Sequence, residues 1–144
     1  MKVDLPKVYN HAEIESKWAK LWEERQIYSF DEKSKRKVYS IDTPPPYPSS
    51  GDFHMGNVLN WTYFDIVARY KRMCGYNVLF PQGWDCHGLP TEVQVEKKYN
   101  IRKGDISREE FRRLCVELTT ENIERMKDEM LNLGFSIDWS TEYK

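Results

Sequence analysis

A proline-rich segment limits the possible folds of this chain more than any other feature. Residues 43–51 read Thr-Pro-Pro-Pro-Tyr-Pro-Ser-Ser-Gly. Because proline has no backbone N–H to donate to a sheet ladder, this segment cannot continue a strand. The β-branched and aromatic residues of 38–42 predict a short strand that stops at Asp42. The chain therefore leaves a sheet here and continues as a loop.

The residues after this loop predict a helix and a second strand. We expect a helix from His54 or Met55 to Met73, with Gly75 just beyond its end. Its inner face is expected to consist of Leu59, Ile66, Tyr70 and Met73. A second strand is expected over 77–81, where an unbroken apolar run is typical of a strand buried on both faces. The order strand, helix, strand implies a parallel pair with a right-handed crossover. The prediction is an α/β fold with a small parallel sheet flanked by helices.

Three further helices are expected. The first follows Asn10 as a cap, covers about 12–26, and has an apolar stripe of Ile14, Trp18, Leu21 and Trp22. The second begins near Pro90 and ends near Tyr99. The third opens with a capping box at 107–110 and runs to Leu133 before Gly134. Its inner face is expected to consist of Phe111, Leu114, Cys115, Leu118, Asn122, Met126, Met130 and Leu133.

Composition excludes several classes of protein. The 144 residues suit one compact domain. The net charge of −1 argues against broad wrapping of nucleic acid, although not against a local contact. The charged link 31–37 is interpreted as a solvated loop in preference to a phosphate site. Three separated cysteines without a C-x-x-C motif indicate reduced cytosolic thiols, with no disulfide framework and no metal site.

Nothing in the sequence predicts a membrane segment or a secretion signal. No apolar run approaches the roughly 20 residues that span a bilayer. The first six residues lack the apolar core of a signal peptide. A cytoplasmic location is therefore expected.

The turn between the first strand and its helix is the first candidate site. Ligands of open α/β sheets bind beyond the carboxyl ends of the strands, and a helix amino terminus favours phosphate. His54 and Asn57 share one face of the first helical turn, and both can donate hydrogen bonds to phosphate oxygens. Gly56 leaves the backbone open to a ligand. The features indicate a nucleotide-phosphate site, with His54 as a simple helix cap or surface residue as the alternative.

The loop after the second strand is the second candidate site, and it leaves the sheet at the same edge. In this loop Asp85 can hold an ammonium group, and Trp84 can wall an apolar pocket. The alternative is a turn-forming Asp85 with Trp84 in the core. The neighbouring Cys86 and His87 also suggest that Cys86 could be a catalytic nucleophile activated by His87. However, the side chains of adjacent loop residues rarely point at each other.

Together these segments resemble the class I aminoacyl-tRNA synthetases of the valine, isoleucine and leucine group. The resemblance spans about 9–143 and rests on residues 42–48, 54–57, 68–75, 83–92 and 134–139. The runs Thr-Pro-Pro-Pro, Phe-Pro-Gln-Gly-Trp-Asp and Leu-Pro-Thr-Glu are most similar to archaeal-type valyl-tRNA synthetases. The resemblance implies a Rossmann-like nucleotide-binding catalytic domain. Residues 38–144 would form its first half, and residues 1–37 a leading helix and link.

The resemblance also implies roles for the candidate residues. The family's first ATP signature includes the positions of His54, Gly56 and Asn57, which would therefore bind ATP. Of these, His54 and Asn57 would be the catalytic residues, because they would contact the phosphates. Asn57 stands where the family commonly has histidine, and an amide donates a hydrogen bond but carries no charge. The amino-acid-binding residues implied by the family are Pro45, Pro46, Tyr47 and Asp85, to which the loop adds Trp84.

The implied reaction activates L-valine with ATP. The valine carboxylate attacks the α-phosphorus of ATP, which enters with Mg²⁺ as substrate, and valyl-adenylate and pyrophosphate form. Transfer to tRNA(Val) follows. This chemistry needs positioning and charge stabilisation, but no protein nucleophile.

The family's second ATP signature, a Lys-Met-Ser-Lys-Ser run, is absent from the 144 residues. We therefore expect a fragment without editing, second-half catalytic and anticodon-binding domains. Weak ATP or adenylate binding, little or no tRNA charging, and self-association through an exposed apolar face are expected. An isoleucyl or leucyl specificity, a non-catalytic amino-acid- or adenylate-binding module, and a structural domain with a degenerate site remain as alternatives.

Overall fold

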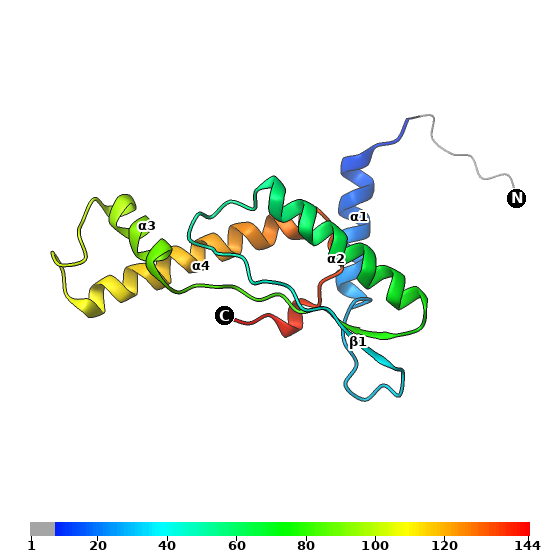
Figure 1. The fold of residues 1–144 in the computed structure, drawn as a ribbon. Coiled ribbons are helices and arrows are strands. Elements are labelled where there is room, and N and C mark those ends of the chain that lie inside the picture. The colour runs from blue at the N-terminus through cyan, green and yellow to red at the C-terminus, as the bar shows by residue number, and fades with distance from the viewer. Residues whose placement is uncertain (1–7) are drawn as a thin grey trace, which may run out of the picture.

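A computed structural model describes residues 8–144 of the chain (Figure 1). Predictions about the first seven residues, including the start of the 1–37 segment and the absence of a signal peptide, lie outside the described residues. The described elements are α1 (His11–Glu24), β1 (Val38–Ser40), α2 (Met55–Met73), β2 (Asn77–Leu79), α3 (Leu89–Tyr99), α4 (Arg108–Asn132) and a 3₁₀ helix (Trp139–Thr141). The predicted mixed α/β class is confirmed.

The sheet consists of two parallel strands, as the order of elements predicted. Val38 pairs with Asn77 and Ser40 with Leu79. The pairing continues one residue further, where the Ile41 N–H donates to the Leu79 carbonyl at 2.9 Å. On the other side of β2, the Asp138 N–H donates to the Phe80 carbonyl at 2.9 Å. The carboxyl-terminal segment therefore lies beside the end of β2.

The inner face of α2 differs from the prediction. Trp61 and Ala68 are fully buried against the main core. The predicted inner residues Leu59, Ile66, Tyr70 and Met73 are all exposed, with between 53% and 80% of their surface accessible. The prediction was wrong because it followed the longer apolar stripe, whereas Val58 and Phe64 pack beside Trp61 against the core, and polar side chains on the same side bind the helix to segment 134–136.

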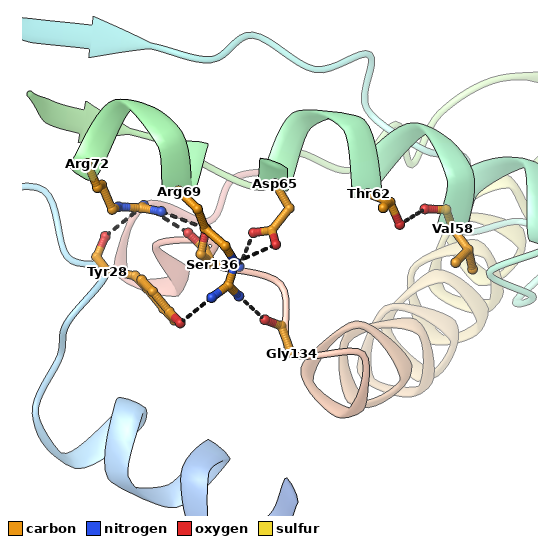
Figure 2. A network of polar contacts seen from close by, with 8 residues as sticks. All are labelled: Tyr28, Val58, Thr62, Asp65, Arg69, Arg72, Gly134 and Ser136. Atoms are coloured by element: carbon orange, nitrogen blue, oxygen red, sulfur yellow. Dashed lines mark hydrogen bonds and ion pairs between the residues drawn. The ribbon is translucent and has the colours of Figure 1, made fainter. Parts of the chain in front are cut away.

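Those polar side chains form the network drawn in Figure 2. One carboxylate oxygen of Asp65 accepts from the backbone N–H of Ser136 at 2.6 Å, and the other accepts from Arg69 at 2.7 Å. The Arg69 guanidinium also donates to the Gly134 carbonyl at 2.5 Å. Arg72 donates to the carbonyl and the hydroxyl of Ser136 at 2.9 and 2.6 Å. The network binds α2 to segment 134–136.

Helix α1 is attached to the rest of the molecule by its carboxyl-terminal end and contains no buried residue. Its stripe is only half-buried at Ile14, Leu21 and Trp22, and Trp18 is exposed. The Arg69 guanidinium lies over the Trp22 ring, 5.5 Å from its centroid. Asn10 occupies the predicted cap position, but its amide donates to Glu13 and accepts no backbone N–H.

Helices α3 and α4 form a hairpin that extends to one side of the molecule (Figure 1). Val95 packs with Phe111, Leu114 and Leu118 in a second, separate core. The Ser107 hydroxyl accepts from the Glu110 N–H at 3.2 Å, which is half of the predicted capping box. Of the predicted inner face of α4, Cys115 is half-buried and Leu133 is exposed, while the other six residues are buried; Thr119 and Ile123 are buried as well, although they were not predicted.

None of the helices in the described part of the chain is long and apolar enough to cross a membrane.

Candidate functional site

Two loops meet beyond the carboxyl ends of β1 and β2, where both candidate sites were expected. The Asp85 N–H donates to the Pro46 carbonyl at 3.1 Å. This bond joins the proline-rich loop to the loop that follows β2. Pro46 is buried, whereas Pro45 and Tyr47 are exposed and Asp85 is half-buried. The structure thus brings Pro46 and Asp85 together, with Pro45 and Tyr47 beside them in the chain.

Helix α4 holds the proline-rich loop in place. The Asn122 amide donates to the Pro48 carbonyl at 2.7 Å, and Arg125 donates to the Gly51 carbonyl at 2.8 Å. Gly51 has a left-handed φ of +73°, and a Cβ there would lie 2.6 Å from the Asn122 amide oxygen. Only glycine therefore lets the loop backbone lie this close to α4 without a shift of the helix.

Asn122 and Arg125 support the proline-rich loop, a role that the sequence interpretation did not assign to them. Asn122 was included in the inner face of α4, where it was the one amide among apolar side chains. A polar residue on an apolar face must find a partner when it is buried. That pattern was the available signal, but it did not reveal which loop supplies the partner.

His54 caps α2. Its Nδ1 accepts the backbone N–H groups of Gly56 at 3.1 Å and Asn57 at 3.4 Å. A Cβ on Gly56 would lie 3.0 to 3.1 Å from the His54 ring, so glycine leaves the room that this cap needs. Because Nδ1 accepts, the hydrogen-bond network assigns the ring proton to Nε2. The His54 side chain is exposed, so Nε2–H remains available as a donor while the ring caps the helix.

The cap interpretation of His54 therefore holds in this structure and is compatible with phosphate binding. Asn57 lies in the first turn of the helix and is half-buried. Within the described residues, no hydrogen bond links His54 or Asn57 to Pro46 or Asp85. In the described residues the two candidate sites therefore lie at one edge of the sheet without a hydrogen bond between these residues.

Asp85 and Trp84 differ in their surroundings. One Asp85 carboxylate oxygen accepts from the His87 N–H at 3.4 Å, which makes Asp85 a turn former. The Trp84 ring is buried in the main core, and its indole N–H donates to Glu142 at 2.7 Å. The core interpretation of Trp84 therefore holds, and its contact with an amino-acid side chain stays a prediction.

Cys86 is poorly suited to nucleophilic catalysis. Burial raises the pKa of its thiol above the ordinary value, so less thiolate is present at neutral pH. The thiol instead contacts the Trp84 carbonyl at 3.7 Å. No hydrogen bond in the described chain joins it to His87.

A buried glutamine fixes the second loop. The Gln82 amide oxygen accepts from the Trp61 indole at 2.9 Å, and its NH₂ donates to the Gly83 carbonyl at 2.7 Å. The Tyr143 N–H donates to the Gln82 carbonyl at 3.0 Å. Gly83 lies against the Tyr143 ring, where a Cβ would lie 2.6 Å from the phenol oxygen. The loop is therefore anchored to α2 on one side and to the carboxyl-terminal segment on the other.

Two hollows open on the surface. One of about 470 Å³ lies between α1, the end of α4 and segment 134–140, away from both loops. The other, of about 420 Å³, is lined by Ser49 and Ser50 of the proline-rich loop and by polar residues of α3 and α4. In the described residues no group of three His, Cys, Asp or Glu side chains is placed to hold a metal ion.

Comparison with known proteins decides the family. Residues 17–144 match the family described as tRNA synthetases class I (I, L, M and V). The chain belongs to this family. A valine–tRNA ligase of Methanothermobacter thermautotrophicus is 63% identical over 139 residues, which cover 96% of this chain and 16% of that protein. A valine–tRNA ligase of Methanocaldococcus jannaschii is 61% identical over 141 residues, or 98% of this chain and 16% of that protein.

A solved structure of the family has the same fold. It is the ternary complex of LeuRS, tRNA and LeuAMS from Agrobacterium radiobacter K84, with a TM-score of 0.79 and 32% sequence identity. The match covers 94% of this chain and 16% of that chain. The class I synthetase chain described here therefore spans about a sixth of the length of the relatives that it matches.

Proposed function

We propose that this chain is the part of a valine–tRNA ligase that binds valine and the phosphates of ATP. The observation that carries the proposal is the hydrogen bond from the Asp85 N–H to the Pro46 carbonyl. It joins the backbone of Asp85 to the proline-rich loop at the edge where α/β folds bind ligands, which supports a site shared by the two loops. Identity near 60% to two archaeal valine–tRNA ligases favours valine over isoleucine or leucine.

In this proposal Asp85 holds the α-ammonium group of valine. Its Oδ1 accepts one long bond from His87, so the carboxylate keeps further acceptor capacity for a charge-assisted bond. Backbone groups of Pro45, Pro46 and Tyr47 border the same space, and Trp84 supports it from the core. These contacts would fix the carboxylate of valine relative to the nucleotide.

His54 and Asn57 bind the ATP phosphates in this proposal. His54 donates from Nε2 while Nδ1 keeps the helix cap, so one ring serves both purposes. Asn57 contributes an amide donor without charge. Gly56 keeps the first turn of α2 open to the nucleotide. The residues stabilise charge on the transferring phosphoryl group, and Mg²⁺ enters with ATP as substrate.

We further assign residues 38–144 to the first half of the nucleotide-binding catalytic domain and residues 1–37 to its leading helix and link. The parent enzyme charges tRNA(Val) in the cytoplasm. The 144 residues alone bind the adenylate weakly and charge tRNA little or not at all, because the relatives are about six times longer.

The test is calorimetric titration with non-hydrolysable valyl-, isoleucyl- and threonyl-adenylate analogues. Tighter binding of the valyl compound is expected. Asp85→Asn should weaken it about 10- to 100-fold, as expected for loss of a charge-assisted bond. Asp128→Asn is the matched control, because Asp128 is exposed on α4 and makes no hydrogen bond with either loop in the described chain. Equal losses in both variants would contradict the role of Asp85.

His54→Asn separates the two tasks of His54. Asparagine is a good helix cap but lacks the Nε2 donor. The variant should keep the stability of the wild type and lose affinity for the adenylate analogue. Unchanged affinity would reject a phosphate contact at His54. Binding of all three analogues without charging activity in any longer form would favour a non-catalytic module.

The exposed face of α2 carries a proposal about assembly. Seven large apolar side chains are exposed along this helix: Met55, Leu59, Tyr63, Ile66, Val67, Tyr70 and Met73. Exposed apolar stripes of this kind favour association. We infer that two copies of the 144-residue chain pair in solution through the part of this stripe from Met55 to Val67. Sedimentation over a concentration series should show a dimer, and a monomer at all concentrations would contradict it.

A further inference from the structure

A cluster of cations and tyrosines lies at the amino-terminal edge of the sheet, opposite the candidate site. We refer to it as the amino-edge patch. Its members are Lys33, Lys35, Arg36, Lys37, Tyr39, Tyr70, Lys71 and Tyr76. They come from the link before β1, from β1, from the end of α2 and from the turn before β2, which gather at one end of the molecule in Figure 1. The Lys37 carbonyl accepts from the Asn77 N–H at 3.0 Å, which sets the link beside that turn.

Lys71 lies among three tyrosine rings. Its Nζ is 4.6 Å from the centroid of Tyr39, 5.2 Å from Tyr76 and 6.0 Å from Tyr70. Lys37 lies over the same Tyr76 ring at 5.8 Å. Two ammonium groups therefore share one aromatic ring. Because like charges repel, an anion bound near this ring would reduce the repulsion between them.

The cations of the patch have no carboxylate partner in the described residues. Arg36 donates only to the Ser34 hydroxyl. By contrast, Lys98, Lys103 and Lys127 each form an ion pair elsewhere on the molecule. Segment 31–37 together with Lys71 carries five cations and two carboxylates, a net charge of +3, so the rest of the chain carries −4. Positive charge is concentrated at this edge.

The link that carries most of these cations is ordered by the protein. The Asp31 N–H donates to the Asn77 amide oxygen at 3.2 Å, and the Asn77 amide donates to the Asp31 carbonyl at 2.8 Å. Asp31 also accepts from the Lys33 N–H at 3.0 Å. Asp31 is thus engaged in the turn. The sequence alone favoured a simple solvated loop, because it did not place Lys71 and the tyrosines next to it.

We propose that the amino-edge patch binds an RNA strand. Unpaired cations bind backbone phosphates, and an exposed tyrosine beside them offers a stacking surface to a base. Tyr70 is 56% exposed and can serve as that surface. The proposal rests on the proposed function, since a tRNA ligase acts on RNA. The amino-edge patch would be an RNA-binding surface on the opposite edge of the sheet from the candidate site, where the amino acid would be transferred.

The test is fluorescence anisotropy with a labelled 12-nucleotide single-stranded RNA over a salt series. Binding that weakens with salt is expected for the wild type. Lys35→Ala combined with Lys37→Ala should weaken binding about tenfold and reduce the log–log salt slope by about 1.4, because each phosphate left without its lysine contributes about 0.7. The matched control removes two exposed cations from the far end of α4, with Arg108→Ala and Arg112→Ala. This control should bind RNA like the wild type.

Tyr70 gives an independent readout. Tyr70→Ala should weaken RNA binding about tenfold at all salt concentrations without changing the slope, whereas Tyr70→Phe should restore binding. The proposal would be overturned if the wild type did not bind RNA or if the control variant lost as much RNA affinity as the patch variant. It would also be overturned if polyglutamate competed for the patch as well as RNA does. The patch variants should bind the valyl-adenylate analogue like the wild type, so failure here is distinguishable from failure of the proposed function.

Discussion

The two faces of α2 show how different forces place one helix. The inner face packs Trp61 and Ala68 into the core, with Val58 and Phe64 beside them, and also contains Asp65, Arg69 and Arg72 in a hydrogen-bond network. The outer face has the longer apolar stripe and is exposed. Core packing around Trp61 and hydrogen bonds from charged groups to segment 134–136 therefore act together to turn the Trp61 side inward.

The largest effect is expected from a pair of truncations on opposite faces. Trp61→Ala should lower the free energy of unfolding by about 3–5 kcal/mol, because it opens a cavity and removes the bond to Gln82. Leu59→Ala should change it by less than about 0.5 kcal/mol, since that side chain is exposed. Urea unfolding followed by fluorescence measures both. Similar losses would mean that both faces are packed in solution.

Breaking the hydrogen-bond network around Asp65 should give the second-largest loss of stability. Asp65→Ala leaves the Ser136 N–H and the Arg69 guanidinium without their carboxylate partner. A loss of about 2–3 kcal/mol is expected, as is usual for hydrogen bonds to charged groups. Glu110→Ala, which breaks an exposed pair with Arg113, is the control and should have no measurable effect. An Asp65→Ala variant as stable as the wild type would show that the network does not fix α2.

A charge on the outer face should change assembly and leave stability almost unaltered. Ile66→Lys places an ammonium group in the exposed stripe and should convert a dimer into a monomer in sedimentation experiments. Its free energy of unfolding, extrapolated to low protein concentration, should stay within about 0.5 kcal/mol of the wild type. If the variant unfolds instead, the outer face is part of the core.

The smallest expected effect is a difference in reactivity between two cysteine thiols, one exposed and one partly buried. Cys74, just beyond α2, is exposed, whereas burial raises the pKa of the Cys86 thiol. The reactive thiolate of Cys86 therefore forms only at higher pH. Iodoacetamide at pH 8 should modify Cys74 faster than Cys86, as followed by mass spectrometry of peptides. Faster modification of Cys86 would contradict its placement.

Much of the fold was predictable because it depends on local rules. The strand before the prolines, the cap at Ser107 and the end of α2 at Gly75 follow from neighbouring residues. The face of α2 was not predictable, since Ser136, which ties Asp65 to the rest of the molecule, lies 71 residues away. The same applies to Asn122 and its partner Pro48.

The candidate site, too, was only partly predictable from the sequence. Its two loops were found because each follows a predicted strand, and parallel strands end at one edge of a sheet. The dual use of the His54 ring, as a cap and a free donor, depends on side-chain geometry that a sequence does not give. The residues that hold the loops, Asn122, Arg125 and Gln82, contact backbone carbonyls or a distant indole.

Locating the bound adenylate on the chain tests the proposed site itself. Backbone amide resonances of the ¹⁵N-labelled chain should be recorded by NMR during titration with the non-hydrolysable valyl-adenylate analogue. We expect shifts in segments 45–57 and 83–88, with Asp85 and Asn57 among the largest, and none in segment 33–37. Shifts confined to the hollow beside α1, or none at saturating analogue, would show that the two loops do not form the binding site.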